Sequence, residues 1–361
     1  MSAARQARVV VGMSGGVDSA VAALRLLESG HEVHGLFMAN WEDDDSYCTS
    51  AQDYQDARAT ARELGIVLHR VSFAEDYRRQ VFAEFLSEYR RGRTPNPDVL
   101  CNREIKFGLC LRYAQRLGAA WFATGHYARL RQASAGPELL RARDASKDQS
   151  YFLCAVARAQ FAQVQFPLGE LEKVAVREEA RRAGLPVFEK PDSTGICFIG
   201  ERPFTEFLAR YIPSTPGPIE SGSGQSLGTH RGLPFYTLGQ RGGLEIGGVS
   251  GGSGDPWYVA GKDPARNALI VIPARERERV RASALRTGTI NWLDTPPERQ
   301  IAITVKTRYR QADQAATLAP QPDGSALIRF ETPQWAMTPG QTAALYCGER
   351  CLGGGVIEET L

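Results

Sequence analysis

The chain of 361 residues is 43% hydrophobic and carries a formal net charge of +2. This length predicts two or three domains, and the small net charge excludes a protein that holds nucleic acid through an overall basic field. The sequence has no apolar run long enough to cross a bilayer and no secretory leader in its first residues, so we expect a cytoplasmic protein with no membrane partner. Its seven cysteines are odd in number and widely spread, unlike a secreted disulfide framework.

The stretch from Val9 to Ser19 predicts a strand, a loop and a helix. The run VVVG is typical of a buried strand, SGGVDS predicts a tight loop, and apolar residues at helical spacing continue to Gly30. Glycines let backbone N–H groups approach a phosphate, and the start of a helix adds partial positive charge. We therefore predict an anion cradle, with an ordinary strand-to-helix turn as the alternative. SGGVDS is not a Walker A loop; it resembles the pyrophosphate loop of enzymes that split ATP into AMP and pyrophosphate.

Strands and helices alternate along the first half of the chain. We predict strands over residues 32–38, 66–73 and 120–124, and helices over 51–64, 77–89, 108–117 and 168–183. Such alternation indicates an α/β fold with a doubly wound parallel sheet, in which ligands bind at the carboxyl ends of the strands. Met38 and the pair Gly125-His126 follow such ends, where a nucleotide is expected. A core methionine and a structural histidine are the alternatives.

The composition changes near Pro213. Residues 212–254 are rich in Gly, Pro and Ser and predict a small middle domain. Short runs at 301–308, 315–318, 326–330 and 342–346 predict the strands of a C-terminal β-barrel. We therefore divide the chain into a pyrophosphate-loop catalytic domain (1–205), a small central domain (206–280) and a β-barrel domain (281–361).

Two segments concentrate positive charge. Residues 88–116 hold seven Lys/Arg against three Asp/Glu, and residues 275–310 hold nine against four. Such patches suit a phosphate backbone, and solvated helix faces and turns are an equal alternative for each.

Cys101 is the first candidate nucleophile. Two prolines keep the preceding segment extended, and Asp98 then predicts the N-cap of a helix whose first turn contains Cys101. With Arg103 and Lys106 nearby, we expect the thiol to have a lowered pKa and to be partly ionised. The alternative is a thiol that packs as a small hydrophobic side chain.

Cys197 is the second candidate nucleophile. Small polar residues over 190–199 predict a tight, mobile loop that presents it. The remaining cysteines are weaker candidates: Cys48, Cys110, Cys154, Cys347 and Cys351. The first three fall in core patterns, and the last two lack the spacing of a redox or zinc motif.

Six segments together resemble the tRNA-specific 2-thiouridylase family, and they follow the family's order over nearly the whole chain. They are GMSGGVDS (12–19), NPDVLCNREIKF (96–107), GHYAR (125–129), DQSYFL (148–153), STGICFIG (193–200) and GLPFYTLGQRGGL (232–244). No functional position departs from the family's pattern. The resemblance implies that sulfur replaces the oxygen at carbon 2 of the wobble uridine of tRNA, after ATP has adenylated that oxygen.

The resemblance also implies roles for individual residues. Cys197 carries a persulfide, Cys101 attacks or resolves it, and turnover ends with a disulfide between them. Asp98 acts as a general acid or base, and Mg²⁺ accompanies ATP. ATP is expected to contact Gly12, Met13, Ser14, Gly15, Gly16, Val17, Asp18, Ser19, Met38 and Gly125. The tRNA is expected to contact Asn96, Pro97, Asp98, His126, Lys147, Asp148, Gln149, Arg308, Tyr309 and Gln341, with Arg308 and Tyr309 in a barrel strand.

The implied partners are the anticodon arm of the Lys, Glu and Gln tRNAs and a persulfide donor, either a cysteine desulfurase or a sulfur relay protein. Three alternatives remain. One is another pyrophosphate-loop ligase that acts on a small molecule and needs neither cysteine. The second is a non-catalytic tRNA- or nucleotide-binding protein, and the third holds an iron–sulfur cluster on Cys101, Cys197 and one further ligand.

Overall fold

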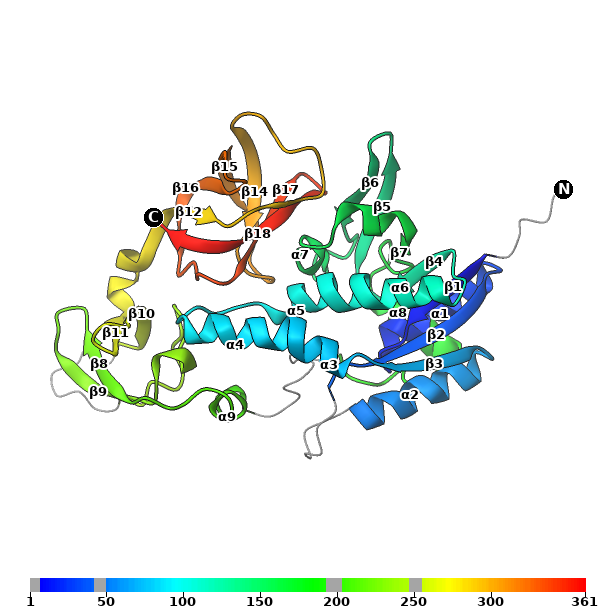
Figure 1. Ribbon diagram of the computed structural model, residues 1–361, viewed down its shortest axis with the longest axis horizontal. Coiled ribbons are helices and arrows are strands. Elements are labelled where there is room, and N and C mark those ends of the chain that lie inside the picture. The colour runs from blue at the N-terminus through cyan, green and yellow to red at the C-terminus, as the bar shows by residue number, and fades with distance from the viewer. Residues whose placement is uncertain (1–6, 42–49, 193–202, 247–254) are drawn as a thin grey trace.

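A parallel sheet organises the N-terminal half of the molecule (Figure 1). The computed structural model describes residues 7–41, 50–192, 203–246 and 255–361. Within these residues, five strands pair in the order β3-β2-β1-β4-β7, and each pairing is parallel. The order reverses at β1, so the doubly wound α/β sheet predicted from the sequence is confirmed. The strands are β1 (Arg8–Gly12), β2 (Glu32–Ala39), β3 (Val67–Ser72), β4 (Trp121–Thr124) and β7 (Val164–Gln165).

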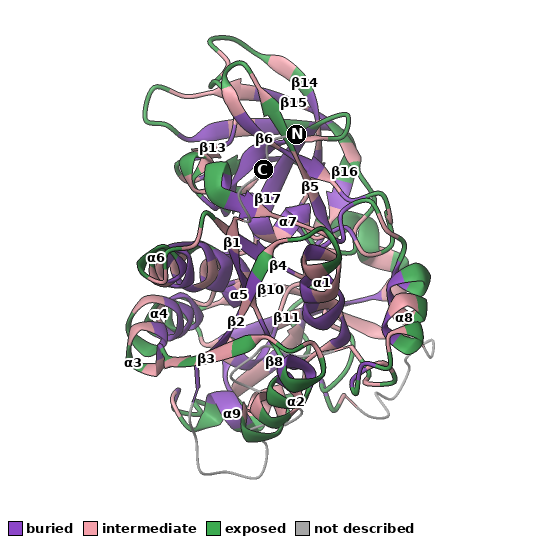
Figure 2. Ribbon diagram, turned by 90° about the vertical axis from the view of Figure 1, so that its right-hand side faces the viewer, coloured by how far each residue is buried: buried purple, intermediate pink, exposed green. Residues whose placement is uncertain are grey.

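Helices cover both faces of this sheet because β1 sends alternate valines to opposite sides. Val9 and Val11 pack with α1, α2 and α8 in one buried cluster, whereas Val10 packs with α3, η1 and α4 in another. Figure 2 shows the buried residues on the inward sides of these helices. The bounds are α1 (Val17–Glu28), α2 (Ser50–Glu63), α3 (Ala74–Tyr77), η1 (Arg78–Phe82), α4 (Ala83–Arg90) and α8 (Lys173–Arg182).

One continuous helix runs from Pro97 to Arg116. It consists of α5 (Pro97–Leu100), η2 (Cys101–Cys110) and α6 (Leu111–Arg116), and η2 is a π-helix. The prediction of a separate helix starting at Gly108 is therefore wrong. Gly108 lies inside the π segment, where a Cβ would stand 3.0 Å from the carbonyl oxygen of Arg103. π-helical turns are rare, and they occur frequently at functional sites.

A carboxylate explains why α8 is shorter than predicted. The sequence predicted a helix from residue 168, but α8 begins at Lys173. The backbone N–H of Lys173 donates to Asp144 at 3.0 Å, so this distant carboxylate caps the helix from outside. The remaining short helices are α7 (Ser150–Leu153), η3 (Arg158–Gln163), α9 (Phe204–Ala209), η4 (Leu233–Phe235) and η5 (Ala274–Val280).

The middle of the chain forms a four-stranded sheet of its own, in the order β10-β11-β8-β9. This confirms the small middle domain predicted from composition. The chain then passes through η5 to the C-terminal strands (Figure 1). The middle strands are β8 (Gly217–Ser221), β9 (Ser226–His230), β10 (Trp257–Asp263) and β11 (Ala268–Pro273).

The C-terminal strands close into the predicted barrel, because β12 pairs with both β16 and β18. The hairpin of β5 (Ala128–Ala133) and β6 (Gly136–Arg141), from the first domain, meets the barrel where Leu140 pairs with Arg350. No helix in the described part of the chain is both long and apolar enough to span a bilayer. The barrel strands are β12 (Arg281–Thr287), β13 (Asn291–Trp292), β14 (Ile301–Lys306), β15 (Gln314–Pro320), β16 (Ala326–Trp335), β17 (Thr342–Cys347) and β18 (Arg350–Thr360).

Candidate functional site

The SGGVDS loop turns sharply between β1 and α1. The hydroxyl of Ser19 accepts the backbone N–H of Ser14 at 3.1 Å and donates to the carbonyl of Gly16 at 3.0 Å. The N-cap of α1 is Gly16, which has no side chain with which to cap the helix. The first N–H groups of α1 therefore receive no side-chain cap from Gly16, and binding of a phosphate there stays a prediction.

Gly15 lets this loop approach α2. Its φ of +76° lies in the left-handed region, and a Cβ there would stand 2.2 Å from the carbonyl oxygen of Asp53. Lys190 Nζ donates to the carbonyl of Gly15 at 3.0 Å and to the carboxylates of Asp53 and Asp56. Burial works to lower the pKa of Lys190, but the bonds to the two carboxylates raise it overall. The ammonium therefore stays charged and fixes the loop to α2.

Asp18, in the first turn of α1, is bound by a second lysine, Lys173. Its Oδ1 accepts the hydroxyl of Tyr127 at 2.8 Å and Nζ of Lys173 at 2.6 Å. Gly125 lets the end of β4 pass beside this turn, since a Cβ there would stand 2.8 Å from the backbone nitrogen of Ser19. The end of β4 and the start of α1 are thus held in contact at the sheet's switch point.

Asp192 gathers three cations beside the same turn. Its carboxylate lies 2.7 Å from Lys173 Nζ and 2.8 Å from both Lys147 Nζ and Arg177. Burial works to raise the pKa of Asp192, but hydrogen bonds from Lys147 and Lys173 outweigh it and lower the pKa to about 2. Sequence reasoning missed this network because Asp18 and Lys173 lie 155 residues apart. The only local signal was the position of Lys190 and Asp192 just before the STGIC segment.

Asn96, rather than Asp98, starts the helix that carries Cys101. Asn96 Oδ1 accepts the backbone N–H groups of Asp98 and Val99 at 3.2 and 3.4 Å, and Pro97 fills the first helical position. The predicted capping role of Asp98 is therefore wrong, as is the placement of Cys101 in the first turn. A proline at the first position needs no capping acceptor, so the cap falls on the residue before it.

Cys101 and Asp98 lie three residues apart on this helix and therefore on the same side. Cys101 is buried, with 2% of its surface exposed. Burial raises the pKa of Asp98, and the nearby ammonium of Lys106 counteracts this only in part. Asp98 therefore keeps its proton to higher pH than an ordinary carboxyl, a property suited to proton transfer.

The same helix packs against both strand ends that flank the loop. The sulfur of Cys110 lies 3.5 Å from the sulfur of Met38 near the end of β2. The ring of Phe107 lies 5.7 Å from that of His126, just past β4. The structure therefore brings the cysteine-bearing helix, the end of β2 and the end of β4 together around the pyrophosphate loop.

His126 is held as a neutral imidazole. Its Nδ1 lies 2.7 Å from the hydroxyl of Thr124. Burial, reinforced by the positive charge of Lys106, lowers the pKa of His126 well below its usual range. His126 therefore offers a hydrogen bond at this site rather than a positive charge.

The polar turn at 147–149 is ordered by bonds within the protein. Asp148 is buried and accepts the hydroxyl of Ser150 at 2.9 Å. Gln149 Oε1 accepts the backbone N–H of Tyr127 at 2.9 Å, and Lys147 makes the ion pair described above. Each of these three residues therefore already has a partner, and Asp148 offers little surface to an RNA.

Arg308 and Tyr309 follow β14 rather than lie in it, because β14 ends at Lys306. Their predicted placement in a strand is wrong. The side chain of Gln311 accepts the backbone N–H of Thr307 at 2.9 Å, which turns the chain at this point. The ring of Tyr309 lies 4.4 Å from that of Phe152 in α7, so the turn still reaches the first domain.

The segment just before Asn96 touches all three parts of the chain. From the barrel, Gln341 Nε2 donates to the carbonyl of Thr94 at 2.7 Å. From the middle domain, the hydroxyl of Thr237 lies 3.2 Å from that of Thr94, and Lys262 Nζ donates to the carbonyl of Gly92 at 2.9 Å. Gln341 thus lies beside the predicted target-base segment.

Cys197, the predicted partner of Cys101, lies outside the described residues, together with the rest of residues 193–202. Cys48 lies outside them too. Convergence of Cys101 and Cys197 therefore stays a prediction. Cys110 and Cys154 are buried as predicted, Cys351 is buried too, and Cys347 is exposed. Across the described residues, no three or more His, Cys, Asp or Glu side chains are grouped so that they could hold a metal ion.

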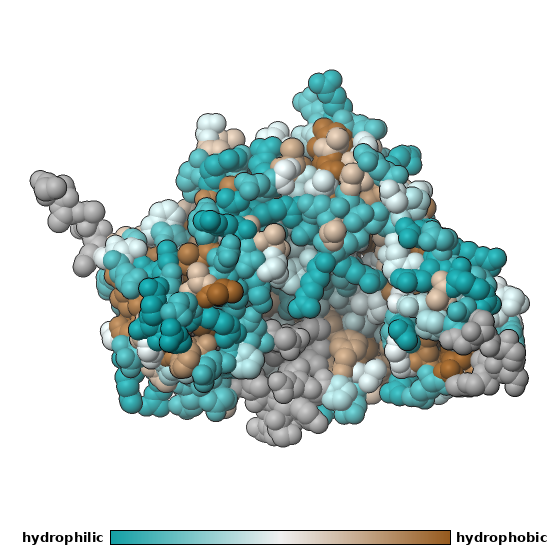
Figure 3. Space-filling view, turned by 180° about the vertical axis from the view of Figure 1, so that it is seen from behind, coloured by the Kyte–Doolittle hydropathy of each residue, from teal (hydrophilic) through white to brown (hydrophobic). Residues whose placement is uncertain are grey.

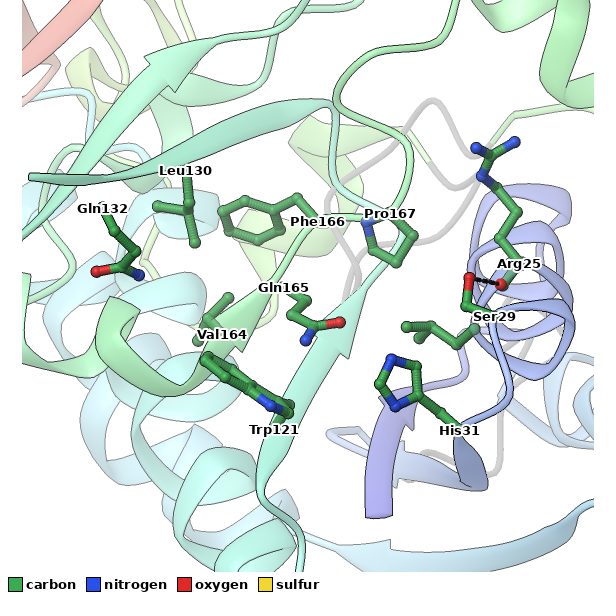
Figure 4. Close-up of a pocket in the computed structure, with 11 residues that line it drawn as sticks. Arg25, Ser29, His31, Trp121, Leu130, Gln132, Val164, Gln165, Phe166 and Pro167 are labelled. Carbon is green, nitrogen blue, oxygen red and sulfur yellow. Dashed lines mark hydrogen bonds between the residues drawn. The ribbon is translucent and has the colours of Figure 1, made fainter. Parts of the chain in front are cut away.

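A cavity of about 430 Å³ lies away from this site (Figure 4). Its walls include Arg25 in the last turn of α1, Ser29 directly after that helix, His31, and Trp121 at the start of β4. The pyrophosphate loop sits at the opposite end of β1 and β4, so the cavity is separate from the nucleotide cradle.

Three family models match consecutive parts of the chain. They are described as tRNA methyl transferase HUP domain (residues 7–201), tRNA methyl transferase PRC-barrel domain (205–273) and aminomethyltransferase beta-barrel domain (282–357).

Full-length relatives match the chain from end to end. The tRNA-specific 2-thiouridylase MnmA of Methylibium petroleiphilum is 52% identical over 98% of this chain and 98% of its own length. The protein of the same name from Cupriavidus necator is 54% identical over 97% of this chain and 98% of its own. That of Burkholderia multivorans is 53% identical over 97% of this chain and 93% of its own.

Proposed function

The chain belongs to the tRNA-specific 2-thiouridylase family, and from that premise we propose that it uses ATP to replace the oxygen at carbon 2 of the wobble uridine of tRNA with sulfur. The observation that best supports this proposal is the packing of the Cys101 helix on both strand ends beside the loop. Cys110 meets Met38 there at 3.5 Å, and Phe107 meets His126 at 5.7 Å. A nucleotide on the loop would thus adjoin the helix that carries the thiol.

The chemistry requires both parts of this site. A uridine carbonyl oxygen is a poor leaving group, so it attacks the α-phosphate of ATP, forms the adenylate and releases pyrophosphate. The loop from Ser14 to Ser19 would hold the pyrophosphate through backbone N–H groups, the Ser14 hydroxyl and the start of α1. Met38 and Gly125 would line the adenosine. Lys190, which fixes Gly15, would keep those N–H groups aligned.

Sulfur then arrives as a nucleophile. The terminal sulfur of a Cys197 persulfide attacks carbon 2 and expels AMP, which leaves uridine joined to Cys197 through two sulfurs. Cys101 next attacks the inner sulfur, and 2-thiouridine departs as the two cysteines form a disulfide. Alternatively, Cys101 attacks the persulfide first and frees hydrosulfide for the same substitution. Both routes transfer one sulfur and end with the same disulfide, which an external thiol must reduce.

Asp98 would manage a proton in these steps. Its raised pKa lets it keep a proton near Cys101 and give it to the departing thiolate or base. Asp18 fits Mg²⁺, because one carboxylate oxygen receives Tyr127 and Lys173 while the other has no partner within the described residues. Bound there with ATP, Mg²⁺ would neutralise charge on the phosphates.

For the tRNA, we propose contacts that follow the geometry around Asn96. Asn96, Pro97 and Asp98 would meet the target base once it leaves its stack. Gln341 lies beside that segment, and Tyr309, which packs on Phe152 of α7, offers a ring for stacking. His126 and Gln149 would meet the base or its ribose, whereas Lys147 and Asp148 would act mainly by ordering their turn, and Arg308 by bracing the barrel. We propose the Lys, Glu and Gln tRNAs as substrates, and a cysteine desulfurase or relay protein as persulfide donor.

Mass spectrometry of the wobble nucleoside tests this function. Unmodified tRNA, ATP and a persulfide source should yield 2-thiouridine, and omission of ATP should yield none. Cys101→Ser and Cys197→Ser should abolish the product while ATP still binds, and Cys347→Ser, at an exposed barrel thiol, should leave it unchanged. A methylated nucleoside, or an ATP-dependent product on a small molecule only, would refute the proposal.

A further inference from the structure

A group of arginines lies where the middle domain joins the barrel, away from the reaction chemistry proposed above. Three of them are neutralised by carboxylates at 2.7–2.8 Å: Arg275 by Asp255, Arg279 by Glu276 and Arg281 by Glu278. Arg277, in the centre of η5, makes no ion pair with any residue that the structure describes. It is exposed, so the group has one uncompensated positive charge at its centre.

Arg277 is held in place by two aromatic rings instead. Its guanidinium carbon lies 4.5 Å from the ring centre of Trp335 and 4.7 Å from that of Tyr258. The two rings are perpendicular, with their centres 5.9 Å apart. Stacking of this kind fixes the plane of the guanidinium while its N–H donors remain available.

These side chains line a hollow of about 230 Å³. Its walls are Ala274, Arg275, Arg277, Glu278, Arg281 and Trp335. With Arg275 paired to Asp255 and Arg281 paired to Glu278, the charge of Arg277 makes the hollow positive, and Trp335 gives it one flat aromatic wall. The combination suits a phosphate that is attached to a ring or a sugar, because the donors bind the oxygens and the indole accepts a stacked face.

Direct contacts connect this hollow to the segment proposed to meet the target base. Trp335 packs on the middle domain at Gly239, where a Cβ would stand 3.1 Å from the indole nitrogen. Two residues earlier, the hydroxyl of Thr237 lies 3.2 Å from that of Thr94. Thr94 is two residues before Asn96. Figure 3 shows one face of the molecule, on which hydrophilic side chains predominate and apolar side chains form small separate patches.

We propose that Arg277 and Trp335 bind the ribose-phosphate backbone of the tRNA strand next to the target nucleotide, Arg277 through a phosphate and Trp335 through stacking. This inference rests on the proposed function, because it assigns a second contact to the same substrate. RNA is favoured over an acidic protein surface because the hollow pairs an aromatic wall with its charge, and because the contacts lead from it to Asn96.

The test measures affinity for unmodified tRNA over a series of KCl concentrations. Arg277→Gln should weaken binding about tenfold and make the slope of log K against log salt shallower by about one, since one phosphate contact is lost. Arg279→Gln removes the same charge from the same segment, but Glu276 already neutralises it, so affinity should stay within about twofold. Arg277→Lys keeps the charge and should keep the slope, while it loses the stacked geometry and part of the affinity.

Several outcomes would overturn the inference. One is equal affinity and slope for wild type, Arg277→Gln and Arg279→Gln. A second is a lower Tm for Arg277→Gln with an unchanged slope, which makes the stack purely structural. Competition by inorganic phosphate or pyrophosphate that disappears in Arg277→Gln would mark a free-anion site, and loss only of donor-dependent sulfur transfer would mark a protein site. If wild type binds tRNA through Arg277 yet never thiolates it, the proposed function fails and this inference stands.

Discussion

The aspartates around the pyrophosphate loop are neutralised by two lysines that lie far from the loop in the sequence. Lys190 ties Gly15 to Asp53 and Asp56, and Lys173 ties Asp18 to Asp192. Without these ammonium groups, four carboxylates would face a bound triphosphate across a short distance. The lysines therefore lower the electrostatic cost of binding ATP as well as fix the shape of the loop.

Replacement of Lys190 tests this balance. Lys190→Met removes the ammonium that binds Asp53, Asp56 and the Gly15 carbonyl, so ATP affinity should fall at least tenfold, which is about 1.4 kcal/mol. Isothermal titration calorimetry with ATP measures the effect. Arg181→Gln breaks an exposed ion pair with Glu178 on α8 and serves as the control, with an affinity close to wild type. Equal affinities for the two variants would contradict the role of Lys190.

Asp98 predicts a pH dependence of stability. Burial raises its pKa in the folded protein above the unfolded value, so the folded state holds this proton more tightly. Stability from this group is therefore present at low pH and is lost as pH rises from the unfolded pKa through the folded one. Asp98→Asn removes this loss of stability with rising pH. The Tm of the variant should therefore exceed the wild-type Tm at pH 7 and approach it at pH 4. A Tm difference that does not change with pH would contradict the raised pKa.

Residue identities at the site were predictable where chemistry demands one residue type in one place. The serines and glycines of the loop and the thiol at Cys101 are of this kind. The N-cap of the Cys101 helix was not predictable in this way. Asn96 and Asp98 are both good caps, and only the position of Pro97 in the helix decides between them. The partners of Asp18 and Asp192 could not be predicted either, since folding alone brings Lys173 to them.

Among the secondary-structure elements, two glycines adopt a left-handed backbone conformation that turns the chain, and one of them also lets two elements pack closely. Gly15 and Gly30 both have left-handed φ, at +76° and +81°. A Cβ at Gly15 would collide with the backbone of α2, whereas none of the described atoms lies within 4 Å of a Cβ at Gly30. Substitution of Gly30 therefore tests backbone strain alone, whereas substitution of Gly15 tests backbone strain together with a steric collision.

Paired substitutions use this difference. Gly30→Ala should lower the free energy of unfolding by about 1 kcal/mol through strain alone and leave ATP affinity within about twofold. Gly15→Ala adds a collision that must displace the loop or α2, so ATP binding should fall by more than tenfold. Urea unfolding and calorimetry measure the two effects. Similar ATP affinities for the two variants would show that close packing of the loop on α2 does not matter for binding.

Elements were predicted well where a periodic apolar pattern set them. The valines of β1 and the apolar spacing of α1 indicated a doubly wound sheet, and that prediction is confirmed. The π segment from Cys101 to Cys110 has no signature in the pattern, so the helix was divided at Gly108. Of the β5–β6 hairpin, the sequence predicts only one strand, over residues 138–143, because charged residues interrupt the alternation and the barrel supplies the packing of the hairpin.

At the scale of the whole molecule, the barrel and the middle domain meet the first domain at the segment that precedes Asn96. Direct bonds from Gln341 and Lys262 hold this segment, and α7 docks on the barrel nearby. Asn291 contributes to that docking, because its Nδ2 donates to the carbonyls of Cys154 and Val156 at 2.8 and 3.0 Å. All three parts of the chain thus meet beside the start of the cysteine-bearing helix.

Loss of the Asn291 bonds should loosen the barrel. Asn291→Ala leaves two carbonyls without their donor, so stability should fall by about 2 kcal/mol and the barrel should unfold in a separate, earlier transition. Scanning calorimetry detects that transition, and the KM for tRNA should rise with it. Asn267→Ala is the control, since Asn267 donates to Thr215 and Pro216 within the middle domain only. A single unfolding transition for Asn291→Ala would contradict this role.

The function proposed above requires Cys101 and Cys197 to exchange one sulfur beside the ATP site. Peptide mapping by mass spectrometry after a single turnover without reductant tests it most directly. We expect a Cys101–Cys197 disulfide in equal amount to the 2-thiouridine formed, and no 2-thiouridine without ATP. Formation of 2-thiouridine at the wild-type rate while both cysteines remain reduced, or in Cys101→Ser, would contradict it.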